Sequence, residues 1–253
     1  MQEPNVLLRE IDENILIATM NRPERMNALG GGLGEALSDA FMDFRNDPNL
    51  SVMVLTGAGD RAFCAGADLK EMTSEGQSAG TRNLRGPLRE KVWKPIIAAI
   101  DGYALAGGFG VTLECDIRLA TERSRLGDTV TRVSALGNLP LLDMMPMGEA
   151  MHMLLTGTHI SAEEAYRMGL VHKVFPDRET MMQEADAIAE QIKLCAPLAT
   201  QAVRRIAYAR REQPPNEIQE LTQSLRKQLS QTEDAKEGPR AFAEKRPPVW
   251  KGR

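Results

Sequence analysis

The stretch that decides the fold is Pro95-Ile96-Ile97-Ala98-Ala99-Ile100-Asp101-Gly102-Tyr103-Ala104-Leu105-Ala106-Gly107-Gly108, an apolar run that ends in small residues. The apolar part predicts a buried strand over 95–100, and residues 109–115 predict a helix directly after the glycines. Small residues let a ligand approach the main chain closely, and the first N–H groups of a helix have no partner within the helix. The stretch therefore predicts a site where backbone N–H groups bind a ligand.

A second run of small residues, Cys64-Ala65-Gly66-Ala67-Asp68-Leu69, lies far from the first in the sequence. Glycine-rich turns between a strand and a helix occur in every α/β domain, so either run alone is more often an ordinary turn than a ligand site. Two such runs aimed at one carbonyl oxygen would form an oxyanion hole, which stabilises the enolate of a thioester. We therefore interpret the pair as a catalytic core.

The composition excludes several other functions. A length of 253 residues with 42% hydrophobic content is enough for one domain or a domain with an appendage. The net charge of −4 gives no electrostatic argument for binding nucleic acid. No stretch approaches the roughly 18 consecutive apolar residues of a membrane span. The three cysteines form no metal-ligand pattern, and the first residues lack a secretion signal, so we expect a cytoplasmic protein without a metal.

Apolar patterning predicts an α/β architecture in the first part of the chain. Strands are expected at 6–9, 15–20, 52–55, 96–100 and 117–120. Apolar residues at helical spacing predict a helix over 33–44, and strands that alternate with helices are typical of α/β folds. From Ala162 onward the pattern predicts an almost wholly helical chain, in which residues 217–243 carry too little apolar surface for a core of their own.

The chain resembles the crotonase, or enoyl-CoA hydratase/isomerase, superfamily over nearly its whole length. The motifs that carry the resemblance follow the family order: Asn21-Arg22-Pro23-Glu24-Arg25-Met26-Asn27-Ala28-Leu29, Val54-Leu55-Thr56-Gly57-Ala58-Gly59, the two small-residue runs, Cys115-Asp116-Ile117-Arg118, Leu155-Thr156-Gly157, Ala165-Tyr166-Arg167-Met168-Gly169-Leu170-Val171 and Glu237-Gly238-Pro239-Arg240-Ala241-Phe242. The tail Glu244–Arg253 is similar to that of the carnitinyl-CoA dehydratase group.

The resemblance implies a crotonase-like spiral of ββα units over residues 1–195. It also implies a C-terminal helical region over 196–253 that forms a trimerisation surface and covers a neighbour's active site. The expected assembly is a homotrimer or a dimer of trimers. A surface helical tail is the alternative interpretation of the same segment.

The resemblance also implies the residues of the site. The N–H groups of Ala67 and Gly107 correspond to the two oxyanion-hole donors. The coenzyme A part of an acyl-CoA thioester substrate is expected to bind along two loops and a basic tail residue: Arg25, Met26, Ala28, Ala65, Asp68, Leu69 and Lys245. Lys70 is a further candidate for the phosphates, although each of these basic residues is also an ordinary surface charge. Coenzyme A enters as part of the substrate, and no separate cofactor is expected.

Two positions depart from the family pattern. Hydratases of the family add water with two carboxylates, one that activates the water and one that supplies a proton. The first stands three residues after the oxyanion glycine, which is Gly110 here, and the second corresponds to Val130. Neither residue can move a proton. The glycine-rich turn that usually follows is also absent, and Asn138-Leu139-Pro140-Leu141-Leu142 replaces it.

Two carboxylates nearby are candidate replacements. Asp128 precedes Val130 by two residues, and in a strand both side chains would share one face, so Asp128 is the first candidate for a substitute base. Its alternative role is a solvent-facing turn residue. Glu114 lies one helical turn beyond Gly110 and is a weaker candidate. Cys64 has no base within reach in the sequence, and we interpret it as a packed thiol rather than a nucleophile.

Two functions of different class follow from these residues. The first is a lyase or isomerase of fatty acid metabolism that acts on an acyl-CoA through an enolate. Isomerisation needs one proton carrier, and decarboxylation makes the enolate by losing carbon dioxide, so both fit better than hydration. The second is a non-catalytic acyl-CoA-binding protein or an inactive subunit with the same fold. An Asp128 carboxylate inside the pocket would favour the first.

Overall fold

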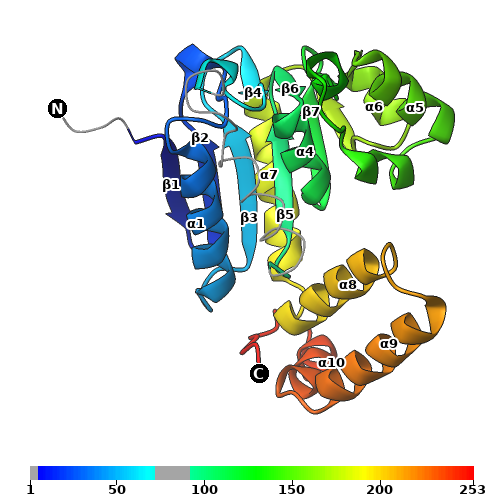
Figure 1. The fold of residues 1–253 in the computed structure, drawn as a ribbon. Coiled ribbons are helices and arrows are strands. Elements are labelled where there is room, and N and C mark those ends of the chain that lie inside the picture. The colour runs from blue at the N-terminus through cyan, green and yellow to red at the C-terminus, as the bar shows by residue number, and fades with distance from the viewer. Residues whose placement is uncertain (1–4, 72–91) are drawn as a thin grey trace.

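The computed structural model describes residues 5–71 and 92–253, which form a larger sheet, a smaller sheet at one end of it, and helices on both faces of the larger sheet (Figure 1). The larger sheet has the order β1-β2-β3-β5-β7-β10, and only β1 and β2 are antiparallel neighbours. Its strands are β1 (Leu7–Asp12), β2 (Ile15–Met20), β3 (Val52–Gly57), β5 (Ile96–Ile100), β7 (Ile117–Thr121) and β10 (Lys173–Phe175).

The smaller sheet has the order β4-β6-β8-β9. Its strands are β4 (Ala62–Cys64), β6 (Tyr103–Leu105), β8 (Arg125–Gly127) and β9 (His159–Ser161). Each of β3, β5 and β7 in the larger sheet leads directly into β4, β6 or β8 in the smaller one, so the chain advances by one strand in both sheets at each turn. This repeated step confirms the predicted spiral of ββα units.

The turn between β5 and β6 is fixed from both sides. Gly102 has φ +80°, and a Cβ there would lie 2.2 Å from the Arg61 carbonyl oxygen, so only glycine fits. The buried Asp101 carboxylate accepts hydrogen bonds from the Thr121 hydroxyl at 2.8 Å and from Arg123 Nε at 2.7 Å. These contacts determine where the chain enters the smaller sheet, and thereby where β6 ends.

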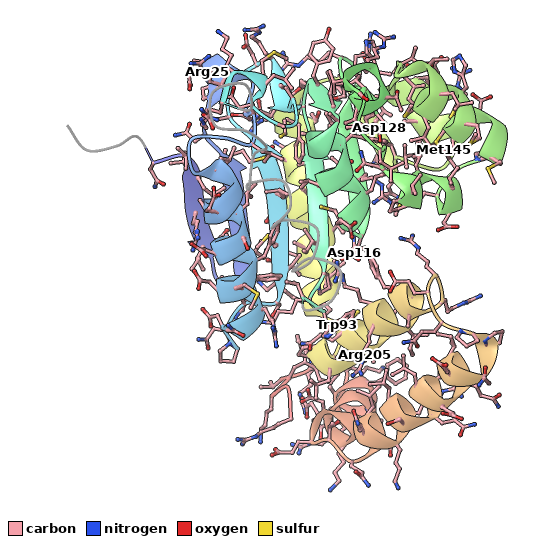
Figure 2. The ribbon with its side chains drawn as sticks, viewed as in Figure 1. Arg25, Trp93, Asp116, Asp128, Met145 and Arg205 are labelled. Carbon is pink, nitrogen blue, oxygen red and sulfur yellow. The ribbon has the colours of Figure 1, made fainter. Side chains whose placement is uncertain are left out.

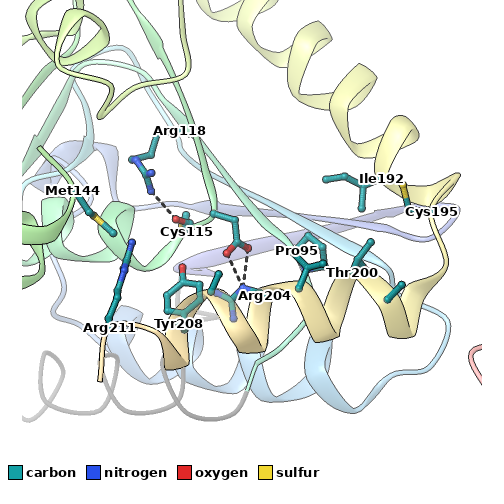
Figure 3. A pocket seen from close by; sticks show the side chains of 14 residues that line it. Pro95, Cys115, Arg118, Met144, Ile192, Cys195, Thr200, Arg204, Tyr208 and Arg211 are labelled. Atoms are coloured by element: carbon teal, nitrogen blue, oxygen red, sulfur yellow. Dashed lines mark hydrogen bonds and ion pairs between the residues drawn. The ribbon is translucent and has the colours of Figure 1, made fainter. Parts of the chain in front are cut away.

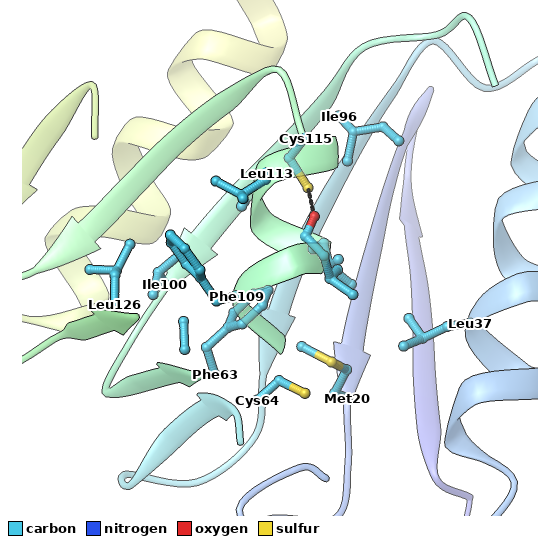
Figure 4. Packing of buried hydrophobic residues seen from close by; sticks show 14 of the residues in the cluster. Met20, Leu37, Phe63, Cys64, Ile96, Ile100, Phe109, Leu113, Cys115 and Leu126 are labelled. Atoms are coloured by element: carbon cyan, nitrogen blue, oxygen red, sulfur yellow. Dashed lines mark hydrogen bonds between the residues drawn. The ribbon is translucent and has the colours of Figure 1, made fainter. Parts of the chain in front are cut away.

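Helices cover the two faces of the larger sheet. These are α1 (Leu33–Asn46) and α4 (Gly107–Glu114) on one face and α7 (Arg178–Lys193) on the other. Phe41 and Phe109 of the first face lie in the main apolar cluster, which Figure 4 shows around α4. Met181 of α7 belongs to a second cluster with the residues of β3 and β5 that point to the opposite face. The sheet is therefore buried on both sides, as parallel sheets require.

The last three helices lie at the end of the larger sheet away from the smaller sheet (Figure 1). They are α8 (Pro197–Ala209), α9 (Pro215–Ser230) and α10 (Asp234–Glu244). The other helices of the described residues are α5 (Met147–Thr156), α6 (Ala162–Arg167) and three short 3-10 helices, η1 (Pro23–Arg25), η2 (Val130–Val133) and η3 (Leu139–Asp143). Among residues 5–71 and 92–253, no helix is both long and apolar enough to span a membrane.

Helix α8 contacts the core at the C-terminal end of α4. Arg204 Nη2 and the Tyr208 hydroxyl donate to the Glu114 carbonyl oxygen at 3.1 and 3.0 Å. Arg118 of β7 donates to the Cys115 carbonyl oxygen at 2.6 Å (Figure 3). Cations near the last carbonyl groups of a helix satisfy unpaired acceptors and oppose the negative end of the helix dipole. The end of α4 is thus held by the sheet and by the C-terminal helices together.

The expected hairpin is confirmed, although its first strand ends at Asp12, three residues later than predicted. The helix over 33–44 and the buried strands are confirmed within one or two residues. The prediction of an almost wholly helical chain after Ala162 is wrong at Lys173–Phe175, which forms β10 and pairs in parallel with β7. Three residues are too short for a periodic signal. Their strand conformation comes from hydrogen bonding to β7, which the sequence pattern does not contain.

The contact between α8 and the core predicts a large cost for replacing Arg204. Its side chain is 4% exposed, and its Nε lies 2.8 Å from both oxygens of Asp116. We expect Arg204→Ala to lower the free energy of unfolding by about 3 kcal/mol, because the partly buried Asp116 carboxylate loses its cationic partner and the hydrogen bond of Arg204 to the Glu114 carbonyl oxygen is lost. Urea denaturation followed by circular dichroism measures this loss.

The neighbouring Arg205 supplies the matched control. Its exposed guanidinium lies 5.9 Å from the Trp93 ring centroid, a contact worth about 0.5–1 kcal/mol. Figure 2 shows Trp93 and Arg205 beside α8. Arg205→Ala is therefore expected to cost no more than that amount, and equal losses in the two variants would contradict the buried role of Arg204.

Candidate functional site

The loop after β4 is held by the segment that follows η1. Leu29 N–H donates to the Gly66 carbonyl oxygen at 2.7 Å, and Ala65 N–H donates to the Met26 carbonyl oxygen at 3.0 Å. Leu29 and Ala67 thereby form a single parallel bridge. The structure brings together the two loops that the sequence predicted for coenzyme A, residues 25–28 and 64–69.

Arg22 fixes these two loops to each other. Its Nη1 donates to the Ala28 carbonyl oxygen at 2.8 Å, and its Nη2 lies 3.3 Å from Asp68 Oδ2 and 3.3 Å from Glu71 Oε1. The Arg22 and Asp68 side chains are only 11% and 9% exposed. Arg22 lies in the motif of residues 21–29, but the sequence predicted no role for it, because its partner Asp68 is 46 residues away.

Asn27 is a second residue that sequence reasoning missed. It is fully buried, and its Nδ2 donates to the carbonyl oxygens of Ala58 and Ala62 at 2.9 and 2.8 Å. Its φ of +53° places it in the left-handed region, which asparagine tolerates better than most residues. Asparagine is common in turns and tolerates a positive φ, so its presence in the motif of residues 21–29 was a sequence signal for this conformation.

The two small-residue runs meet at Gly66. A Cβ on Gly66 would lie 2.8 Å from Ala106 Cβ, 2.9 Å from the Leu105 carbonyl oxygen and 3.0 Å from the Gly107 nitrogen. Gly66 also has φ +92°, which disfavours any other residue. Glycine at this position lets the loop that carries Ala67 lie directly against the peptide that carries the Gly107 N–H.

The peptide before Gly107 has an uncommon conformation. Ala106, which precedes α4, has φ +52° and ψ −119°. Its N–H donates to the Gly127 carbonyl oxygen at 3.0 Å, and its own carbonyl oxygen accepts from Gly110 N–H at 2.9 Å and from Asn138 Nδ2 at 3.1 Å. A residue other than glycine in this region costs free energy, and such positions concentrate at functional sites.

Asp128 is fully buried and bonded on both oxygens. Its Oδ1 accepts from Val130 N–H at 3.2 Å, and its Oδ2 accepts from the N–H and from Nδ2 of Asn138, the latter at 2.7 Å. The expectation of a shared strand face with Val130 is wrong, because β8 ends at Gly127 and Val130 begins η2. The bond from Asp128 to the N–H two residues later turns the chain out of the strand.

Position 110 is occupied by a neighbouring amide. A Cβ on Gly110 would lie 2.4 Å from Asn138 Oδ1, so the Asn138 side chain fills the space that a side chain at 110 would take. Glu114 lies at the opposite end of α4 from Gly107, where its backbone carbonyl binds α8. The structure thus places Asp128, through Asn138, nearer to the start of α4 than it places Glu114.

The basic candidates separate into two groups. Arg25 and Lys70 are exposed beside the two loops, as is Leu69 with 55% exposure. Lys245 directly follows α10, at the other end of the molecule from Arg25 (Figures 1 and 2). Within one chain, therefore, Lys245 does not join the loops of residues 25–28 and 64–69.

Three further observations bear on the chemistry that the chain can perform. Burial raises the pKa of the Cys64 thiol to about 12, so the thiolate is scarce at neutral pH and the interpretation as a packed thiol is confirmed. Within the described residues, no three or more His, Cys, Asp or Glu side chains are grouped to hold a metal ion. A cavity of about 570 Å³ lies at the C-terminal end of α4 between Arg118, Asp116 and α8, away from Gly107 (Figure 3).

Comparison with known proteins gives one consistent result. The chain matches the family described as enoyl-CoA hydratase/isomerase over residues 10–253. It is 39% identical over 251 residues to (E)-benzylidenesuccinyl-CoA hydratase of Thauera aromatica, covering 96% of this chain and 98% of the relative. It is 38% identical over 253 residues to carnitinyl-CoA dehydratase of Salmonella typhi, covering 94% and 95%.

Solved structures agree with these relatives. An enoyl-CoA hydratase from Bacillus anthracis superimposes with a TM-score of 0.91 at 31% identity, covering 98% of this chain and 100% of that one. An enoyl-CoA hydratase from Mycobacterium marinum gives 0.89 at 36% identity, covering 99% and 100%. The fold is shared over the whole length.

Substitution by alanine is expected to have opposite effects on stability at Gly66 and at Gly148. We expect Gly66→Ala to lower the free energy of unfolding by roughly 2–4 kcal/mol, because steric overlap adds to an unfavourable φ. A Cβ added to Gly148, the second residue of α5, would meet no atom within 4 Å, so Gly148→Ala is expected to stabilise by about 0.4–1 kcal/mol because it restricts the unfolded chain. Thermal and urea unfolding of both variants measure the difference. A Gly66→Ala variant as stable as the parent would contradict the close approach.

Proposed function

The chain belongs to the enoyl-CoA hydratase/isomerase family, and we propose that it binds an acyl-CoA thioester and stabilises its enolate with the N–H groups of Ala67 and Gly107. The observation that carries this proposal is the close approach of the loop at Gly66 to the Gly107 peptide, where an added Cβ on Gly66 would lie 3.0 Å from the Gly107 nitrogen. Removing one donor of such a hole typically costs about 3–4 kcal/mol of transition-state stabilisation. Both proposed donors are backbone groups, so the stabilisation of the enolate depends on the conformation of the main chain at these two residues.

The coenzyme A moiety is proposed to lie along the paired loops. Backbone atoms of Met26, Ala28 and Ala65 border the parallel bridge between these loops, and the exposed Leu69 lies at the end of the second loop. Arg25 is positioned on the surface to meet a phosphate. Asp68 is proposed to act indirectly, since its carboxylate pairs with Arg22 and holds the loop in place.

Isomerisation or decarboxylation suits the site better than two-carboxylate hydration. Gly110 and Val130 have no side chain that can donate or accept a proton, and the Asn138 side chain occupies the space beside Gly110. Asp128 remains the candidate base for isomerisation. Because the Asp128 carboxylate is fully buried and bonded on both oxygens, decarboxylation, which needs no base to form the enolate, has the stronger geometric support.

A homotrimer or a dimer of trimers is proposed as the functional assembly. Lys245 follows α10, which lies at the opposite end of the molecule from Arg25, so it reaches a coenzyme A site only from a second copy (Figures 1 and 2). Exposed apolar side chains support such contacts, among them Phe242 of α10 at 87% and Leu136 at 76% exposure. The reduced state of the three cysteines suits the cytoplasm, where we propose that the protein acts.

A panel of enoyl-, dienoyl- and malonyl-type CoA thioesters tests the function. We expect a double-bond isomer or a decarboxylated product, separated by chromatography and identified by mass spectrometry. Rapid addition of water to crotonyl-CoA would contradict the interpretation of Gly110 and Val130. Tight binding of the thioesters without any turnover would show a non-catalytic binder and would overturn the enzyme proposal.

Asp128→Asn tests whether Asp128 can be the base of an isomerase. Asparagine keeps the size of the side chain and a hydrogen-bond acceptor but removes the proton-accepting charge. If Asp128 is the base of an isomerase, kcat is expected to fall about 100-fold or more, while calorimetry gives an unchanged Kd for the thioester. Unchanged turnover on an enoyl-CoA would eliminate Asp128 as the base.

A further inference from the structure

We propose that Asn138 is a positioning residue for the Gly107 N–H, and that Asp128 holds Asn138 in the orientation this requires. The inference rests on the proposed function, in which the Gly107 N–H binds the thioester oxygen. It assigns a role to a residue that lies in the segment where the family's glycine-rich turn is missing. It also gives the buried Asp128 a role that does not depend on proton transfer.

The first step concerns the peptide that joins Ala106 to Gly107. Its carbonyl oxygen accepts from Asn138 Nδ2 at 3.1 Å and from Gly110 N–H at 2.9 Å. A peptide unit is planar, so holding the carbonyl group on one side fixes the direction of the Gly107 N–H on the other. Ala106 has φ +52° and ψ −119°, a conformation that persists only where its surroundings hold it.

The second step concerns the orientation of the amide. Asn138 is 3% exposed, and its two Nδ2 hydrogens suffice for Asp128 Oδ2 at 2.7 Å and the Ala106 carbonyl oxygen. Asp128 Oδ2 also accepts the backbone N–H of Asn138, and Oδ1 accepts Val130 N–H. A carboxylate accepts hydrogen bonds only, so it selects the rotamer in which Nδ2, not Oδ1, faces Asp128.

The third step concerns the room for this amide. A Cβ on Gly110 would lie 2.4 Å from Asn138 Oδ1 and 3.2 Å from Asn138 Cγ. The Asn138 side chain therefore fits only because residue 110 has no side chain. Because residue 110 is glycine, no side chain at this position can carry a proton. The same lack of a side chain leaves room for the Asn138 amide, which holds the peptide between Ala106 and Gly107.

Infrared spectroscopy of a bound thioester tests the role directly. The probe is butyryl-CoA labelled with ¹³C at its carbonyl carbon, whose carbonyl band shifts to lower wavenumber when donors polarise it. We expect the full-length protein to shift the band and Asn138→Leu, which keeps the volume without donors, to lose at least half of the shift. The Kd for butyryl-CoA is expected to change less than about threefold, while kcat on the substrate found by the panel falls about 10–100-fold.

The outcomes separate the two proposals. An unshifted band in the parent protein would overturn the proposed function, and this inference with it. A shift that persists unchanged in Asn138→Leu would overturn the inference alone. Asn49→Leu, at an exposed asparagine, is the matched control and is expected to leave the band and kcat unchanged.

A double-mutant cycle adds a test that does not depend on Asn138→Leu folding well. Gly110→Ala is expected to reduce the band shift as Asn138→Ala does, because the added Cβ displaces the amide. In the Asn138→Ala background the same Gly110→Ala change is expected to have no further effect, since the amide is already gone. Independent, additive losses would overturn the proposed contact.

Discussion

At Gly66 the chain passes so close to the backbone of residues 105–107 that no side chain fits between them. This approach depends on the two preceding strand steps, from β3 to β4 and from β5 to β6, each of which carries the chain from the larger to the smaller sheet. Gly102 and Asp101 fix the second step, and Asn27 and Arg22 fix the segment that borders the first. Two loops that are far apart in the sequence are thereby presented side by side.

Helix α4 connects this contact to the rest of the molecule. At its first turn the peptide of Ala106 and Gly107 is bonded to Asn138 and Gly110. At its last turn Arg118 donates to the Cys115 carbonyl oxygen (Figure 3), and Arg204 donates to the Glu114 carbonyl oxygen. Both ends of this eight-residue helix are held by hydrogen bonds. Helix α4 therefore links the C-terminal helices to the two loops that carry Ala67 and Gly107.

The polar groups near the start of α4 form one hydrogen-bonded network. Gly110 leaves a space, Asn138 fills it, and Asp128 uses both of its oxygens to accept hydrogen bonds from neighbouring N–H groups. A buried carboxylate or amide that loses a hydrogen bond costs free energy, so the network favours the one arrangement in which these bonds form together. In the function that we propose, this arrangement holds the Gly107 N–H in place for the thioester oxygen, while Gly110 and Val130 have no side chain that can transfer a proton.

The sequence by itself determined the family, the alternation of strands and helices, and the two runs of small residues, because apolar periodicity and glycine placement act over a few neighbouring residues. It also showed that residues 110 and 130 cannot carry protons. Only the tertiary structure decided that Lys173–Phe175 is a strand, that Arg22 joins Asp68, and that Asn138 occupies the space at Gly110. Each of these depends on a partner dozens of residues away or on the space left by a missing side chain. Such contacts form only in the folded chain, so the order of residues in a short segment does not predict them.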